Sequence, residues 1–235
     1  MRLYYKEWDK PEVEIPAGAN ILGENDIAPI HAIATYPIGV CWEVWGIRKV
    51  LENEEGFFDF NKNLVDIGAG LGEYSYYLPF NHAYAFEPNK TMLYKMHTNL
   101  VLFDKVYDVD TFNYMLSDKH EIVKFDGFYN EAGGQEDYNK DISVDCHTKI
   151  LDDFNIENVG LIKVDVEGME EKVLRGGIGT IIRNNYPPIL FECWDVGSYG
   201  MTQEKHDSLF GYLNSLGYEI LEYWVDFETH LAIHK

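Results

Sequence analysis

Acidic side chains stand at the ends of four apolar segments of this chain. These residues are Asp66, Glu87, Asp165 and Glu192. A carboxylate is costly to bury without a partner, so four of them in equivalent positions indicate a function. Carboxylates at such positions can accept hydrogen bonds from ribose hydroxyls, take up a proton from a reacting group or ligate a divalent cation. The chain therefore carries a candidate site for ligand binding and group transfer.

Three glycines at alternate positions, Gly68, Gly70 and Gly72, follow the apolar segment that contains Asp66. Glycine lets the backbone turn sharply and approach a ligand closely. A helix predicted from Tyr74 onward would point its free N–H groups at whatever occupies the loop. The dinucleotide fingerprint has the spacing G-x-G-x-x-G. Here the spacing is G-x-G-x-G with an acidic residue two positions before it, which favours S-adenosylmethionine over NAD. Glu87 is placed to accept hydrogen bonds from the ribose.

Strands and helices are predicted to alternate from residue 64 onward, which is typical of a parallel, doubly wound sheet. In such a sheet the ligand lies beyond the carboxyl ends of the strands, where the acidic residues are expected. The third strand is predicted over residues 106–109, and a helix over residues 169–175 that stops at the following two glycines. Two closing strands, over residues 218–223 and 230–234, would add an antiparallel edge.

Composition and charge exclude several functional classes. The chain has 235 residues, with 40 acidic against 19 basic ones, and a formal net charge of -21. Because nucleic-acid affinity comes mostly from basic side chains, no nucleic-acid partner is expected. No apolar run is long enough for a membrane span. Its three cysteines are far apart and lack metal-ligand spacing, which predicts reduced thiols in the cytoplasm. The chain carries no signal for its oligomeric state.

The chain resembles FkbM-type methyltransferases. The matching segments are residues 65–75, 85–88, 116–118, 148–154, 162–170 (IKVDVEGME), 173–177 and 188–192. Leu71 departs from the pattern, because many members carry asparagine there. The resemblance implies an α/β, Rossmann-like class I methyltransferase fold with a seven-stranded, mostly parallel, doubly wound sheet and an antiparallel terminal edge. It also implies O-methylation of a hydroxyl on a small, hydroxyl-rich acceptor, a sugar or glycan. We expect the methyltransferase domain to span residues 41–235, after an N-terminal cap or extension at residues 1–40.

Site residues follow from the pattern and the resemblance together. For binding of S-adenosylmethionine we predict Asp66, Gly68, Ala69, Gly70, Gly72, Tyr74, Glu87, Pro88, Ser117, Asp118 and Asp165. Ser117 and Asp118 are expected near the adenine, where the third strand ends. For catalysis we predict Asp165, Glu167 and His147, with His31 as an alternative base. For a divalent cation, Mg²⁺ or Mn²⁺, we predict Asp165, Glu192 and Asp195 as ligands.

Two other functional classes remain compatible with the sequence. The first is a nicotinamide-dependent oxidoreductase, against which stand the glycine spacing and the lack of a Ser-Tyr-x-x-x-Lys-like catalytic set. The second is a non-catalytic cofactor-binding module, against which stands the intact set of Asp165, Glu167 and Glu192. Measuring whether the chain binds S-adenosylhomocysteine or NAD distinguishes a methyltransferase from an oxidoreductase. Measuring turnover distinguishes an enzyme from a non-catalytic module.

Overall fold

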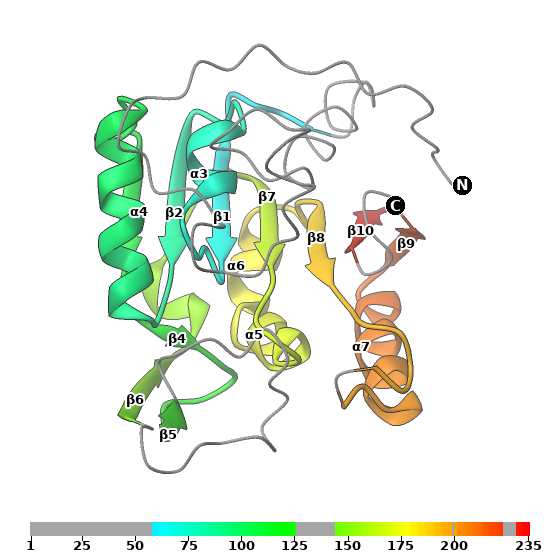
Figure 1. Ribbon diagram of the computed structural model, residues 1–235. Helices are drawn as coiled ribbons and strands as arrows, with labels where there is room; N and C mark the ends of the chain where they lie inside the picture. Colours follow the sequence, from blue (N-terminus) through cyan, green and yellow to red (C-terminus); the bar gives the residue numbers. More distant parts are fainter. Residues whose placement is uncertain (1–57, 126–143, 199, 223–228) are drawn as a thin grey trace, which may run out of the picture.

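The computed structural model describes residues 58–125, 144–198, 200–222 and 229–235. Its central element is a seven-stranded sheet with the order β3-β2-β1-β7-β8-β10-β9 (Figure 1). The strands are β1 (Asn63–Ile67), β2 (His82–Phe86), β3 (Val109–Phe112), β7 (Val159–Val164), β8 (Ile189–Glu192), β9 (Tyr218–Glu222) and β10 (Thr229–His234). This arrangement confirms the predicted Rossmann-like sheet.

Strand direction follows the predicted pattern. The five strands from β3 to β8 pair in parallel. Strand β10 runs antiparallel to both of its neighbours, β8 and β9, and forms the predicted terminal edge. All residues of β1 and β7 are buried, as expected for parallel strands that are covered on both faces. The carboxyl ends of β1, β2, β7 and β8 therefore meet at one edge of the sheet.

Helices cover the two faces of the sheet with separate apolar cores. Helices α3 (Glu73–Tyr77) and α4 (Lys90–Leu102) pack on one face through residues such as Tyr74 and Met96. The other face is covered by the 3₁₀ helix η1 (Leu151–Phe154) and by α5 (Glu170–Gly176), α6 (Ile178–Arg183) and α7 (Gln203–Ser215). Because side chains alternate along each strand, neighbours such as Leu64 and Val65 enter different cores.

Two elements differ from the sequence-based expectation. The third strand begins at Val109 rather than ending there, because the segment after α4 forms turns in which the Lys105 ammonium contacts the Asp108 carboxylate at 2.8 Å. Helix α5 ends at Gly176 with Gly177 as its C-cap, as predicted, but Gly177 is also the N-cap of a further helix, α6, that the sequence analysis did not predict. Both carboxylate oxygens of Asp152 accept backbone N–H groups of α6, from Gly179 and Thr180, and so satisfy its first turn.

A second, three-stranded sheet lies beyond the carboxyl ends of β1 and β2 (Figure 1). It has the order β4-β6-β5, with β4 (Met115–Leu116), β5 (Ile122–Phe125) and β6 (Val144–Lys149). The sequence analysis does not predict this separate sheet.

Several predicted features lie outside the described residues. They are the cap at residues 1–40, which includes His31, and the first part of the predicted methyltransferase domain, residues 41–57. Within the described part of the chain, no helix is long and apolar enough to cross a membrane.

Candidate active site

The glycine loop turns directly from β1 into α3 at the carboxyl edge of the sheet. All three glycines have positive φ angles, which L-residues with a Cβ rarely adopt. At Gly68 a Cβ would lie only 1.7 Å from the Asp165 carbonyl oxygen, so the loop can approach the end of β7 only with glycine there. At Gly70 a Cβ would meet no atom within 4 Å, so this part of the loop faces open space. The loop is therefore held close to β7 on one side and is open to a ligand on the other.

Glu87 holds the glycine loop from the end of β2. One of its carboxylate oxygens accepts the Gly70 N–H at 2.9 Å, and the other accepts the Asn89 N–H at 2.7 Å. Burial raises the pKa of Glu87 to about 7, against the effect of these two backbone hydrogen bonds. Each carboxylate oxygen can accept a second hydrogen bond, so Glu87 can hold the loop and still accept one from a ligand.

Asp66 is fully buried and contacts the protein itself. One carboxylate oxygen accepts the Ser75 hydroxyl at 2.7 Å, and the other lies 3.6 Å from the Lys163 ammonium. Burial raises the pKa of Asp66, while Lys163 and Ser75 lower it. Asp66 therefore ties β1 to α3 through Ser75 and to β7 through Lys163.

Lys163 is a buried cation at the centre of the site. Its ammonium donates a hydrogen bond to the Gly68 carbonyl at 2.7 Å and lies 3.3 Å from the Asp165 carboxylate. It also lies 5.0 Å from the centre of the Tyr74 ring. Lys163 therefore links the glycine loop, the Asp66 carboxylate and the Asp165 carboxylate.

The predicted site residues do not include Lys163. A lysine inside an otherwise apolar strand was the available signal. Lys163 and Asp165 are two positions apart, and Lys163 is in register with Asp66 on the neighbouring strand β1. Side chains at such positions lie on one face of a sheet, so the strand pairing explains the contacts.

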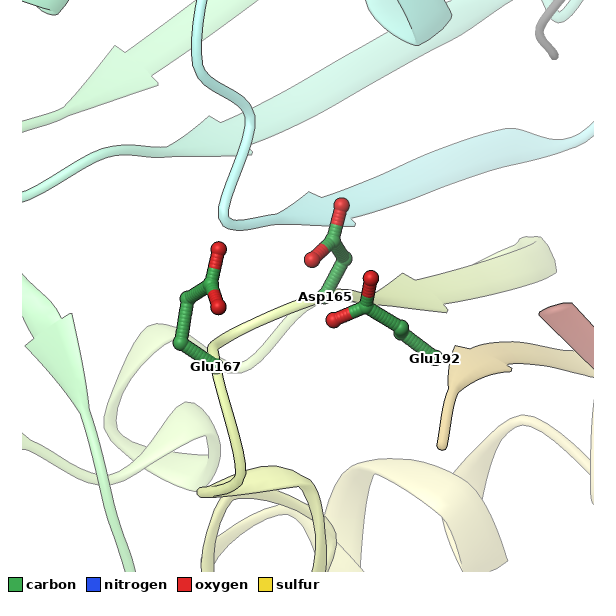
Figure 2. Close-up of side chains that lie close together, drawn as sticks. All are labelled: Asp165, Glu167 and Glu192. Carbon is green, nitrogen blue, oxygen red and sulfur yellow. The ribbon is translucent and has the colours of Figure 1, made fainter. Parts of the chain in front are cut away.

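Three half-buried carboxylates gather where β7 and β8 end. One oxygen atom from each of Asp165, Glu167 and Glu192 lies within 4.8 Å of the others. Figure 2 shows Asp165 and Glu167 on the segment that follows β7, and Glu192 at the end of β8. Like charges at this distance repel, unless a cation or shared protons offset the repulsion. We call these three residues the carboxylate group.

A cavity of about 670 Å³ lies between α5 and α7, and Glu167 is the member of the carboxylate group that lines it. Asp165 and Glu192 line a separate, much smaller cavity beside Tyr74 and Lys163. Glu167 and Gly168 line the larger cavity on one side, and Trp194, Met201 and Leu209 contribute apolar surface on the other. Its position beyond the ends of β7 and β8 is where open α/β sheets bind ligands. The larger cavity therefore offers room for an acceptor next to Glu167.

The remaining predicted residues lie further from the carboxylate group. Asp195 is exposed and is not part of it. His147 is exposed on β6 in the second sheet. Ser117 follows β4 and is buried against α5, with Asp118 next to it at the rim of the cavity.

The expected place of Ser117 and Asp118 at the end of the third strand is wrong, because that strand ends at Phe112. The residue that follows β3 is Asn113, which the sequence analysis did not single out. Its side-chain amide donates hydrogen bonds to the carbonyls of Glu87, at 2.9 Å, and of Pro88, at 2.8 Å. Asn113 therefore ties the end of β3 to the turn that carries Glu87.

Comparison with known proteins identifies the family of this chain. A family model described as the methyltransferase FkbM domain matches residues 66–220, more than half of the chain. The chain belongs to the FkbM methyltransferase family. The match includes the glycine loop, Glu87 and the whole carboxylate group. A search of curated proteins found no match.

Solved structures agree with this family in their fold. Methyltransferase FkbM from Methylobacillus flagellatus KT has a TM-score of 0.58 and 18% identity, over 80% of this chain and 48% of that one. The chain thus spans about half the length of that protein. A protein assigned as a caffeoyl-CoA O-methyltransferase from Staphylococcus aureus has a TM-score of 0.52 and 13% identity, over 88% and 89% of the two chains. Identities this low establish the class I methyltransferase fold alone.

Proposed function

We propose that this FkbM-family chain transfers a methyl group from S-adenosylmethionine to a hydroxyl of a small, hydroxyl-rich acceptor, a sugar or glycan. The observation that carries the proposal is the carboxylate group, in which Asp165 is linked to the glycine loop through Lys163 and Glu167 lines the cavity. A hydroxyl is a weak nucleophile at its ordinary pKa and needs a base or a metal ion beside it. The carboxylate group supplies candidate bases at the point where cofactor and acceptor would meet.

The residues around the glycine loop fit S-adenosylmethionine. The open side of Gly70 gives a backbone surface for the cofactor, and Glu87 retains acceptor capacity for the ribose hydroxyls. When bound, the cofactor supplies an electrophilic methyl group on a sulfonium cation. That positive charge suits an edge of the sheet where Asp165 and Glu87 stand close to the loop. NAD would bring a phosphate pair to this acidic edge, which favours the sulfonium cofactor.

We assign to Asp165 the role of the base that takes up the proton of the acceptor hydroxyl. Its carboxylate is held by Lys163 at 3.3 Å, and its backbone N–H donates to the Ile67 carbonyl at 3.0 Å, so its position is fixed relative to β1. Glu167 and Glu192 would orient the acceptor hydroxyls around it. His147, exposed on the second sheet, is a less suitable base in this arrangement.

A divalent cation, Mg²⁺ or Mn²⁺, is a further part of the proposal. Carboxylate oxygens are the ligands that such hard cations prefer, and the three oxygens of the carboxylate group lie within 4.8 Å of one another. These residues therefore fit a cation bound by Asp165, Glu167 and Glu192. Full transfer activity in EDTA would contradict the cation and leave Asp165 as the base.

The experiment that tests the function is methyl incorporation from S-adenosylmethionine into a panel of nucleotide sugars, free sugars and glycans. We expect transfer to a hydroxyl of at least one member, and tight binding of S-adenosylhomocysteine but not NAD in calorimetry. Binding of NAD alone would favour an oxidoreductase, and binding of S-adenosylhomocysteine without any transfer would favour a non-catalytic module. We also propose that the acceptor is not a nucleic acid, because a net charge of -21 disfavours binding to phosphates. Adding RNA to the acceptor panel tests this, and we expect no methyl transfer to it. We also propose a cytoplasmic location.

A further inference from the structure

Glu170 is a buried carboxylate to which the proposed mechanism gives no part. It is the first residue of α5, and only 2% of its surface is exposed. Its Oε1 atom accepts two backbone hydrogen bonds, from Val166 at 3.1 Å and from Gly168 at 3.0 Å. A buried carboxylate needs such partners, and here all the named partners belong to the turn between β7 and α5.

The two residues that donate hydrogen bonds to Glu170, Val166 and Gly168, flank Glu167 in the sequence. Glu167 has a φ angle of 58°, a conformation that is uncommon for residues with a side chain, and Gly168 has a φ angle of 88°. The turn must take this course for the Glu167 carboxylate to lie beside Asp165 and Glu192. A single acceptor atom that binds the N–H before Glu167 and the N–H after it fixes that course.

We propose that Glu170 is a positioning residue that holds the β7–α5 turn so that Glu167 faces the carboxylate group and the cavity. Glu170 also lies along the cavity, but its carboxylate accepts hydrogen bonds from the turn, so we assign it to positioning and not to the transfer step. The inference rests on the proposed function in one respect, that the carboxylate group acts on the acceptor. It gives the acceptor side of the site a support of its own, separate from the Glu87 support of the glycine loop.

The test compares Glu170→Met, Glu170→Asp and Glu170→Gln with the wild type. Methionine removes the acceptor atom, aspartate keeps the charge but shortens the reach, and glutamine keeps a carbonyl oxygen that can accept both N–H groups. The control is Glu157→Met, because Glu157 is exposed and precedes the same strand β7. Three quantities are measured: amide hydrogen exchange, calorimetric affinity for S-adenosylhomocysteine, and turnover with the panel sugar that the wild type methylates fastest.

In Glu170→Met we expect the amides of Val166 and Gly168 to exchange at least about tenfold faster, because their acceptor is gone. The amides of the glycine loop should exchange as in the wild type, and affinity for S-adenosylhomocysteine should stay within about twofold. Turnover should fall by about tenfold or more, since a misplaced group near the reacting atoms is costly. Glu170→Asp should behave similarly, Glu170→Gln should recover most of the turnover, and Glu157→Met should match the wild type.

Unchanged exchange at Val166 and Gly168, or unchanged turnover in Glu170→Met, would overturn the inference. So would a parallel loss of S-adenosylhomocysteine affinity, which would mean general destabilisation. Should Glu170→Met not fold, the contrast between Glu170→Asp and Glu170→Gln decides by the same criteria. If the wild type methylates no panel member, the proposed acceptor class fails, and the exchange rates still decide whether Glu170 holds the turn.

Discussion

Acidic residues at the ends of neighbouring strands do different work on the two sides of this site. On the glycine-loop side, Asp66 and Glu87 are buried, and their oxygens face Ser75, Lys163 and backbone N–H groups. On the side of β7 and β8, the carboxylate group is half-buried and its members face one another. Burial and partners, rather than position at a strand end, separate the two carboxylates that brace the loop from the three to which we assign the acceptor chemistry.

The largest effect is expected where the two sides are joined, at Lys163. Lys163→Met leaves the buried Asp66 carboxylate without its cation and frees the Gly68 carbonyl. Removing one partner of a buried ion pair costs about 3–5 kcal/mol, so the free energy of unfolding should fall by that amount in urea denaturation. Asp66→Asn added to Lys163→Met should recover part of the loss. If the double variant loses as much free energy of unfolding as Lys163→Met alone, the pairing between Lys163 and Asp66 does not contribute to stability.

The pH dependence of stability tests the burial of Glu87. Burial also raises the pKa of Glu170 to about 7, so only the difference between the wild type and a Glu87 variant isolates the part that Glu87 contributes. The pKa of Glu87 is raised from 4.5 to about 7 in the folded chain, so the folded state binds more protons than the unfolded state between these values. Stability must therefore decrease as the pH rises from about 4.5 to about 7, by on the order of 1–3 kcal/mol from this group. Glu87→Gln should remove this part of the decrease in urea denaturation at pH 5 and pH 8. A slope identical to that of the wild type would contradict the burial argument.

The smallest effect on stability is expected for Gly70→Ala, which should nevertheless weaken binding of S-adenosylhomocysteine. An alanine there meets no neighbouring atom but must adopt a φ angle of 54°, which costs about 1 kcal/mol. The added methyl group would occupy the open side of the loop, so affinity for S-adenosylhomocysteine should fall at least tenfold in calorimetry. Gly211→Ala, in α7 and also without neighbours within 4 Å, is the control and should bind normally. Normal binding by Gly70→Ala would show that the ligand does not lie against this loop.

Sequence patterns predicted the architecture because the sheet is built from buried apolar segments whose ends are marked by acidic residues. The order of elements and the antiparallel edge at β10 follow from that alternation, and the family match agrees. The start of β3 was displaced because an ion pair between Lys105 and Asp108 forms in a turn that has no apolar pattern. Helix α6 was missed because its first turn is satisfied by Asp152, a residue distant in the sequence.

The sequence pointed to Asp165, Glu167 and Glu192, which lie close together in the structure, but it did not show how the surroundings of the acidic residues differ. Asp66 and Asp165 look equivalent in the sequence, since each marks the end of an apolar segment. Their difference arises from tertiary structure. Both carboxylates contact Lys163, but Asp66 is fully buried and accepts the Ser75 hydroxyl, whereas Asp165 is half-buried beside Glu167 and Glu192. Glu170 could not be distinguished from other glutamates, because its role depends on a turn with positive φ angles at Glu167 and Gly168.

The most direct test of the division between the two sides makes the same substitution on each, Glu87→Gln and Glu192→Gln. For each variant, the calorimetric affinity for S-adenosylhomocysteine is compared with the rate of methyl transfer at saturating cofactor. We predict that Glu87→Gln loses affinity at least about tenfold, while Glu192→Gln binds as the wild type does but transfers methyl groups about 10²-fold more slowly. Equal losses of affinity in both variants, or near-normal transfer in Glu192→Gln, would contradict the account.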